Sequence, residues 1–155
     1  MGRVIMAPGR LNVVPGERSV FLAGSIEMGQ AEPWQSEVEH ALRDLDVVIL
    51  NPRRADWDAS WKQTVEDPQF RAQVEWELAA LELAALVLMY FAPGTKSPIT
   101  LLELGLFARS GKLVVCCPEG YWRKGNVDIV CARYAAEMVP DLGALVRRAR
   151  ELLGA

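Results

Sequence analysis

The sequence predicts an α/β protein with a parallel sheet that helices cover on both faces. Short apolar runs such as Val20 to Ala23, Val47 to Leu50 and Leu113 to Cys117 show no polar–apolar alternation, which is typical of strands buried on both sides. Segments with helical spacing separate these runs, and strands that alternate with helices indicate a parallel sheet. Five expected strands suggest a flavodoxin-like doubly wound sheet. Right-handed connections then bring the carboxyl ends of its strands to one edge.

The expected elements follow one another in a regular order. The strands cover 19–24, 47–50, 86–91, 113–117 and 137–139. The helices cover 33 to about 44, 69–84, a segment that begins at Pro98, about 127–134, and 141–154. Pro33 and Pro98 suit the first turn of a helix, where the backbone nitrogen needs no partner. Ser97 and Asp141 are of the residue types preferred as N-caps.

Two helices carry clear expectations about burial. The helix that begins at Pro98 is apolar on nearly every face, so we expect it to be buried against the sheet. In the helix at 69–84, we expect Trp76 in the core and Glu77 solvated or paired. The spacing in that region predicts a core face of Val74, Leu78, Leu81 and Ala85.

Composition bounds the class of protein. The chain of 155 residues is long enough for a sizeable core, so we expect one domain over 1–155 with an N-terminal extension at 1–18. The net charge of -3 argues against nucleic acid as the partner, and the apolar stretches are too short to span a membrane. The N-terminus is not a convincing signal peptide, so the expected location is cytoplasmic. The three cysteines and one histidine lack metal-ligand spacing, so we expect no metal and no cofactor.

Glu103 is the most informative residue of the chain. It lies in an apolar helix, about one turn from the start and near the positive end of the helix dipole. Glutamate is almost never fully buried without a partner or a task. Glu103 therefore either has a chemical role in a site or merely caps backbone amides or meets an arginine. The spacing alone favours neither interpretation.

The carboxyl edge of the sheet collects other candidate residues, and crevices at such edges are where doubly wound sheets bind ligands. Trp57 and Trp61 form either a platform for a flat heterocycle or a face that packs on the core. The aspartates beside Trp57 favour a site. The turn at 24–29 either admits a sugar or phosphate or is a plain connection. The candidates besides Glu103 are Gly24, Ser25, Ile26, Asn51, Asp56, Trp57, Asp58, Trp61, Ser97, Pro98 and Asn126.

Several segments carry a resemblance to a known family through their order and spacing. They are Phe21-Leu22-Ala23-Gly24-Ser25, Asn51-Pro52-Arg53-Arg54, Asp56-Trp57-Asp58 with Trp61, Gln73-Val74-Glu75-Trp76-Glu77, Ser97 to Gly105, and Arg123-Lys124-Gly125-Asn126-Val127. Together they resemble the nucleoside 2-deoxyribosyltransferase family, specifically its nucleoside 2-deoxyribosyltransferase-like branch. The resemblance covers Val20 to Tyr134.

The resemblance implies a flavodoxin-like fold, oligomers with shared active sites, and cleavage of the N-glycosidic bond of 2′-deoxynucleosides. The family's nucleophilic glutamate lies in the motif matched by Leu102-Glu103-Leu104-Gly105, so the resemblance gives that role to Glu103. The family's asparagine from a neighbouring subunit is matched by Asn126.

The chain departs from the family's pattern at three positions. Ala84-Ala85 stands where many members have an aspartate, and Ser97 stands where well-studied transferases have an acidic residue. Proton delivery to the leaving base then requires another group, for which Asp56 and Asp58 are the candidates. Glu27 stands where nucleotide-hydrolysing relatives have a basic residue, which disfavours a 5′-phosphate substrate.

The expected function is thus transfer of deoxyribose from a nucleoside to another base or to water, through a covalent ester on Glu103. The expected partners are a small-molecule nucleoside or nucleobase and further copies of the chain, in a homo-oligomer with active sites near the subunit interface. The alternatives are a nucleoside or nucleotide N-glycosidase and a non-catalytic nucleotide-sensing domain.

Overall fold

The computed structural model describes residues 2–26, 33–54, 58 and 60–154 of the chain. In this part of the chain all strands belong to one parallel sheet of six strands, in the order β1-β3-β2-β4-β5-β6. The strands are β1 Arg3–Met6, β2 Arg18–Gly24, β3 Val47–Asn51, β4 Leu86–Tyr90, β5 Leu113–Cys116 and β6 Glu137–Val139. The helices are α1 Trp34–Leu42, α2 Pro68–Leu83, α3 Pro98–Phe107, α4 Lys124–Tyr134 and α5 Leu142–Gly154.

The doubly wound fold is confirmed, and the expected number of strands was one too few. The additional strand is β1, which pairs with β3 from Arg3↔Val48 to Met6↔Asn51 at the edge of the sheet. Its side chains alternate between exposed and covered positions, and only Ile5 is buried. A strand this short has little apolar signal. Part of the expected N-terminal extension therefore belongs to the sheet.

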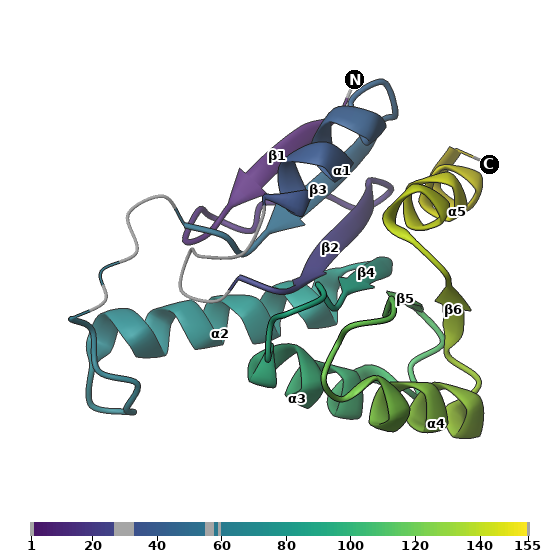
Figure 1. Cartoon of the computed structure of the whole chain (residues 1–155). Coiled ribbons are helices and arrows are strands. Elements are labelled where there is room, and N and C mark those ends of the chain that lie inside the picture. Colours follow the sequence, from purple (N-terminus) through teal and green to yellow (C-terminus); the bar gives the residue numbers. More distant parts are fainter. Residues whose placement is uncertain (1, 27–32, 55–57, 59, 155) are drawn as a thin grey trace.

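The helices form a layer on each face of the sheet. The helices α2, α3 and α4 pack on one face, where Trp76, Leu104 and Cys131 enter the core. The helices α1 and α5 pack on the other, through side chains such as Trp34 and Leu145. Figure 1 shows α1 and α5 above the sheet and the other three helices below it.

The strand order sets the place of the site. After β2 the chain moves to β3 on one side, and after β3 it crosses to β4 on the other side of β2. The loops after β2 and β4 therefore diverge over opposite faces of the sheet. Such a switch point leaves a crevice at the carboxyl ends of the two strands. The chain after β2 holds Gly24, and the chain after β4 leads to α3 with Glu103.

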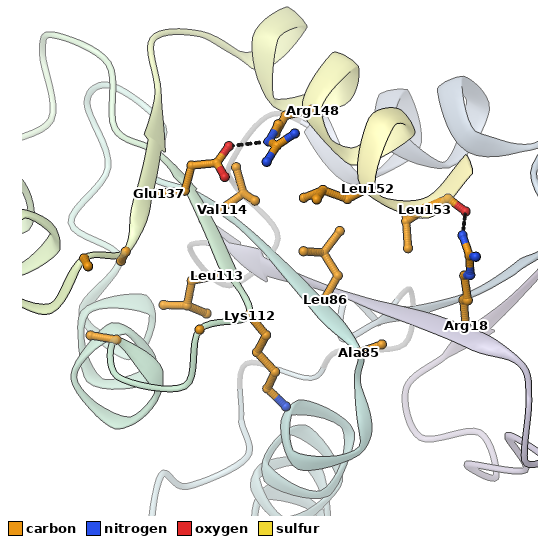
Figure 2. A pocket seen from close by; sticks show the side chains of 14 residues that line it. Arg18, Ala85, Leu86, Lys112, Leu113, Val114, Glu137, Arg148, Leu152 and Leu153 are labelled. Atoms are coloured by element: carbon orange, nitrogen blue, oxygen red, sulfur yellow. Dashed lines mark hydrogen bonds and ion pairs between the residues drawn. The ribbon is translucent and has the colours of Figure 1, made fainter. Parts of the chain in front are cut away.

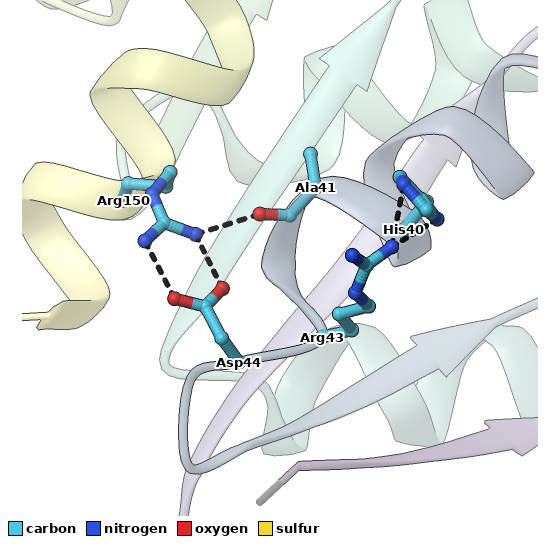
Figure 3. Close-up of polar contacts among 5 residues, drawn as sticks. All are labelled: His40, Ala41, Arg43, Asp44 and Arg150. Atoms are coloured by element: carbon cyan, nitrogen blue, oxygen red, sulfur yellow. Dashed lines mark hydrogen bonds and ion pairs between the residues drawn. The ribbon is translucent and has the colours of Figure 1, made fainter.

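Polar contacts fasten α5 to the turn after α1. Arg150 donates to both carboxylate oxygens of Asp44, at 2.7 and 2.8 Å, and to the carbonyl of Ala41 at 2.7 Å. Figure 3 shows this fork and the neighbouring His40 and Arg43. The arginine side chain lowers the pKa of Asp44 to about 2. Asp141 caps α5 as expected, because its Oδ1 accepts the backbone N–H of Ala144 at 2.8 Å.

Two expectations about burial were wrong. On α2 the buried residues are Gln73, Trp76, Ala80 and Leu81. Of the expected core face, Val74, Leu78 and Ala85 are exposed. The helix thus directs an amide inward and places aliphatic side chains outward. On α3 one face covers the core and the opposite face is open: Ile99, Leu102 and Leu106 are 58%, 61% and 56% exposed.

Candidate functional site

A pocket of about 450 Å³ lies between α2 and α3 at the carboxyl edge of the sheet. This size suits a small organic ligand. Its aliphatic wall comes from exposed residues of the two helices, among them Val74, Leu78, Ile99, Leu102 and Leu106. Its charged lining groups, among the residues that the structure describes, are Arg54, Glu77 and Glu103. The pocket is thus an apolar slot with a carboxylate from each helix.

Glu103 is held near the middle of α3, on the side of the helix that faces the core and the pocket. The residue is 6% exposed. Within the described residues its carboxylate has no hydrogen bond and no ion pair, so it neither caps a helix nor meets an arginine there. Burial raises the pKa of Glu103 well above its ordinary value, and the charge of Glu77 raises it further. A buried carboxylate without a partner is costly, which is typical of a group kept for chemistry.

Glu77 supplies the second carboxylate of the pocket, from α2. Burial raises the pKa of Glu77 to about 7, and a hydrogen bond from Gln73 opposes part of this effect. Because the charge of Glu77 disfavours ionisation of Glu103, the titrations of the two carboxyl groups are coupled. When singly protonated, such a pair can supply one carboxylate and one proton donor at the same time.

Gln73 connects Glu77 to the loop after β3. Its Nε2 donates to Glu77 Oε2 at 3.0 Å and to the carbonyl of Pro52 at 3.0 Å. Its Oε1 accepts from Arg54 Nη1 at 3.4 Å. The guanidinium of Arg54 also lies over the ring of Trp61, 4.8 Å from its centroid. These contacts therefore form a polar chain on the side of the pocket opposite α3, beside the aliphatic residues of α2.

The turn after β2 lies beside the pocket and is fixed by close packing. Gly24 lines the pocket, and a Cβ at this position would overlap the carbonyl oxygen of Tyr90 and the indole of Trp34. Ile26 also lines the pocket. The backbone N–H of Ser25 donates to Tyr90 at 3.1 Å, which continues the pairing of β2 with β4.

Three hydroxyl groups join this turn to the start of α3. The Oγ of Ser25 lies 2.9 Å from Thr95 Oγ1 and 2.5 Å from Ser97 Oγ, and it accepts the backbone N–H of Ala92 at 2.9 Å. Ser97 occupies the N-cap position, as expected, but its side chain does not cap the helix. Its backbone is left-handed, with φ 46°, and its hydroxyl bonds to Ser25 and Thr95 instead. Ser97 and Pro98 line the pocket, whereas Ser25 is fully buried behind it.

The other sequence-predicted residues have diverse positions. Asn51 is buried and binds Glu39 and the backbone of Arg53, so it organises the loop. Asp58 is exposed, and its carboxylate accepts from the hydroxyl and the backbone N–H of Ser60. Trp61 packs under Arg54 rather than lining the pocket. Asn126 is exposed on α4, away from the pocket lining of its own chain. Asp56, Trp57 and Glu27 lie outside the described residues.

Sequence reasoning missed Glu77 as the second carboxylate of the pocket that holds Glu103. Along α2 the residue has the spacing of an ordinary half-exposed helical position. One signal was present: Gln73 and Glu77, four residues apart, place polar groups together on one helix face, beside the apolar Trp76 and Ala80.

A second cavity, of about 520 Å³, lies at the opposite edge of the sheet, where β2, β4, β5 and β6 begin. Its charged groups bind one another or backbone oxygens. Arg148 pairs with Glu137 at 2.6 Å, and Arg18 donates to the carbonyl of Leu153, as Figure 2 shows. Lys112 donates to the carbonyls of Leu81 and Ala84. These contacts hold α2, α5 and the sheet together.

The three cysteines are buried on the sheet and α4. Burial raises the pKa of Cys116 to about 12 and those of Cys117 and Cys131 to about 11. Thiols in such surroundings are poor nucleophiles. Among the described residues there is no cluster of three or more metal-ligating side chains, and none of the helices found there is long and apolar enough to cross a membrane.

Comparison with known families identifies the chain. Residues 17–121 match the family model described as "Nucleoside 2-deoxyribosyltransferase like", which is more than half of the chain. The chain belongs to this family. The match includes both pocket glutamates and ends before Asn126. Among curated proteins, none matches the chain significantly.

Solved structures share the fold. A conserved protein from Enterococcus faecalis V583 superposes with a TM-score of 0.61 and 13% identity, over 88% of this chain and 99% of the other. The CMP N-glycosidase BcmB of Clostridium botulinum superposes with a TM-score of 0.52 and 16% identity, over 86% of this chain and 99% of the other. At these identities the likeness is one of fold.

Proposed function

We propose that this chain cleaves the N-glycosidic bond of a 2′-deoxynucleoside and passes the sugar to another nucleobase or to water. The observation that carries the proposal is the pair of glutamates, Glu77 and Glu103, in one apolar pocket. The family and the likeness in fold to a CMP N-glycosidase support a role in cleaving glycosidic bonds. The aliphatic wall of the pocket is suited to the flat face of a nucleobase.

In the proposed reaction an oxygen of Glu103 attacks C1′ of the sugar. The C1′–N bond breaks, its electron pair stays on the base nitrogen, and the proton of Glu77 neutralises the departing base. In the second step the nitrogen of an incoming base, or a water oxygen, attacks C1′. The C1′–O bond to Glu103 breaks, and the carboxylate of Glu77 takes the proton of the nucleophile.

Glu77 takes the acid role in this proposal for two reasons. It lines the same pocket as Glu103, and burial raises its pKa to about 7, so a substantial fraction of the protein carries the Glu77 proton at neutral pH. Asp58, by contrast, is exposed and bound to Ser60, which lowers its pKa. The singly protonated pair has two arrangements of its proton. Positive charge developing at C1′ favours the one with Glu103 ionised.

Substitution of Glu103 tests the nucleophile. Glu103→Gln keeps the volume of the side chain and removes its charge, so the protein should fold while base exchange and base release fall by at least about 10³-fold. The assay is chromatography of deoxynucleosides incubated with the protein and a free base. A 2′-fluorinated analogue should leave a sugar on the peptide that contains Glu103, as mass spectrometry would show. A sugar on another residue, or full turnover in Glu103→Gln, would contradict the proposal.

Hydrolysis of a nucleoside monophosphate is a second candidate. Arg54 favours this candidate. Among the described residues that line the pocket, it supplies the positive charge, and a guanidinium is suited to bind phosphate. Parallel assays with a deoxynucleoside and its 5′-monophosphate separate the two substrates. Base exchange, base release without exchange, and no turnover in either assay distinguish a transferase, a hydrolase and a nucleotide-sensing domain.

A further inference from the structure

In the side-chain amide of Gln73, both N–H groups and the oxygen have hydrogen-bond partners. Gln73 is 3% exposed, so these contacts form in a nearly dry environment. One N–H donates to the Pro52 carbonyl and the other to Glu77 Oε2, each at 3.0 Å. The oxygen accepts from Arg54. A buried amide that is satisfied in this way has one stable orientation.

The chemistry of the partners fixes the direction of the amide. A carbonyl oxygen only accepts hydrogen bonds, and a guanidinium only donates them. If the amide were turned over, its oxygen would face the Pro52 carbonyl and its NH₂ group would face Arg54. Both contacts would then be repulsive. The amide therefore always presents an N–H to Glu77, whatever the protonation state of the carboxyl group.

We propose that Gln73 is a positioning residue that holds Oε2 of Glu77 as an acceptor and thereby confines the acidic proton to Oε1. An N–H aimed at one oxygen of a carboxyl group favours the carbonyl form of that oxygen, because a carbonyl oxygen accepts a hydrogen bond more strongly than a hydroxyl oxygen does. The proton of Glu77 then has one location instead of two, and the side chain is kept in one rotamer. This inference deepens the proposed function and rests on it for the destination of the proton.

The same contact tunes the acidity of the group. Among the described residues, the charged and polar groups that face Glu77 are Glu103 on α3 and Gln73 on its own helix, with Arg54 behind Gln73 in the loop. The Gln73 amide lowers the pKa of Glu77 against the effect of burial. Without this donor, the carboxyl group would hold its proton more tightly and release it less readily to a leaving base.

Gln73→Met tests the proposal, because methionine has a similar length and lacks the amide. The pKa of Glu77 is measured by ¹³C NMR of labelled glutamate carboxyl groups in the free protein, with Glu77→Gln to assign the resonance. We expect Gln73→Met to raise this pKa by about one. We expect kcat to fall about tenfold, KM to change little, and the acidic limb of the pH–rate profile to move upward. Gln69→Met, at an exposed position one turn earlier on α2, should match the wild type in all of these.

The titration of Glu77 tests its contact with Gln73, whereas the turnover tests the role of that contact in the reaction. An unchanged pKa of Glu77 in Gln73→Met would overturn the proposal, with or without an active enzyme. A raised pKa with unchanged kcat would overturn the positioning role. A wild-type protein without turnover would contradict the proposed function, while the titration would still decide the contact. If Gln73→Met does not fold, Gln73→Asn withdraws the amide from Glu77 by one methylene and keeps a polar group in the site, and the same shift is expected.

Discussion

Glu103 and Glu77 show how a pair of residues acquires properties that neither position has alone. Each would be an ordinary acid in water. Burial raises the pKa of both, and the charge of Glu77 acts on Glu103. The sequence indicated Glu103, because a single carboxylate in an apolar helix stands out. It did not indicate Glu77, because the place of this residue in the pocket depends on how α2 and α3 lie on the same face of the sheet.

The proton donor can be identified by substitution. If Glu77 is the acid, Glu77→Gln should lower kcat by about 10²–10⁴-fold, since general acid catalysis contributes that much. Asp56→Asn and Asp58→Asn should then remain within a few-fold of the wild type. The comparison uses a poor leaving base and a good one, because only the poor one needs a proton. Slow turnover in Asp56→Asn together with normal turnover in Glu77→Gln would assign the acid to the loop.

The pocket carboxyl groups should also make stability depend on pH. Their pKa values are raised in the folded protein, so the native state holds more protons than the unfolded chain from about pH 4.5 upward. Stability should therefore fall as pH rises through the folded pKa of Glu77, about 7. Urea denaturation at pH 5 and pH 8 should show a loss on the order of 1–3 kcal/mol that is smaller in Glu77→Gln. An equal loss in both proteins would place the effect elsewhere.

At the scale of elements, most of the fold could be predicted from sequence. Apolar runs and prolines located β2 to β6 and the helices to within a few residues. The strand β1 escaped because it is short and half exposed. The predicted orientation of α2 was wrong because its aliphatic residues line a pocket rather than the core. Hydrophobic spacing does not distinguish these two environments.

The junction of β2 with β4 allows a matched test of packing. Gly24→Ala should destabilise the protein by about 1–3 kcal/mol, because the new methyl group meets the carbonyl of Tyr90 and the ring of Trp34. Gly105→Ala on α3 faces open space and should stabilise it by about 0.5–1 kcal/mol, as alanine favours a helix. Thermal unfolding of both variants measures the difference. Equal effects of the two changes would contradict the tight packing at Gly24.

At the scale of the whole molecule, the open face of α3 is an exposed apolar surface. Ile99, Leu102 and Leu106 form an aliphatic stripe along this helix and continue into the wall of the pocket. The sequence predicted an apolar helix that is buried against the sheet. An apolar pattern does not show whether the sheet or another subunit covers a given face of the helix.

We expect this face to join copies of the chain in a homo-oligomer. Light scattering at micromolar concentration should give at least the mass of a dimer, and Leu102→Asp should lower it. Leu152→Asp, on α5 at the other face of the sheet, should leave the mass unchanged. A monomeric wild type would contradict the prediction.

A shared site makes a further demand on the oligomer. If Asn126 acts at the Glu103 of another subunit, Asn126→Ala and Glu103→Gln should each be nearly inactive alone. Mixed subunits should then recover part of the activity, because some sites combine both intact residues. No recovery after proven exchange of subunits would place each active site within a single chain.

The burial of the three cysteines simplifies the measurement of distances between subunits. With pKa values of about 11 to 12, their thiols are almost entirely protonated at the pH where maleimides and spin labels react. The native chain therefore offers such reagents little to modify. An exposed Asn126→Cys substitution would be the dominant labelling site in each subunit. Probe-to-probe distances in the assembled protein could then be read directly, with no need to remove a native cysteine from the core.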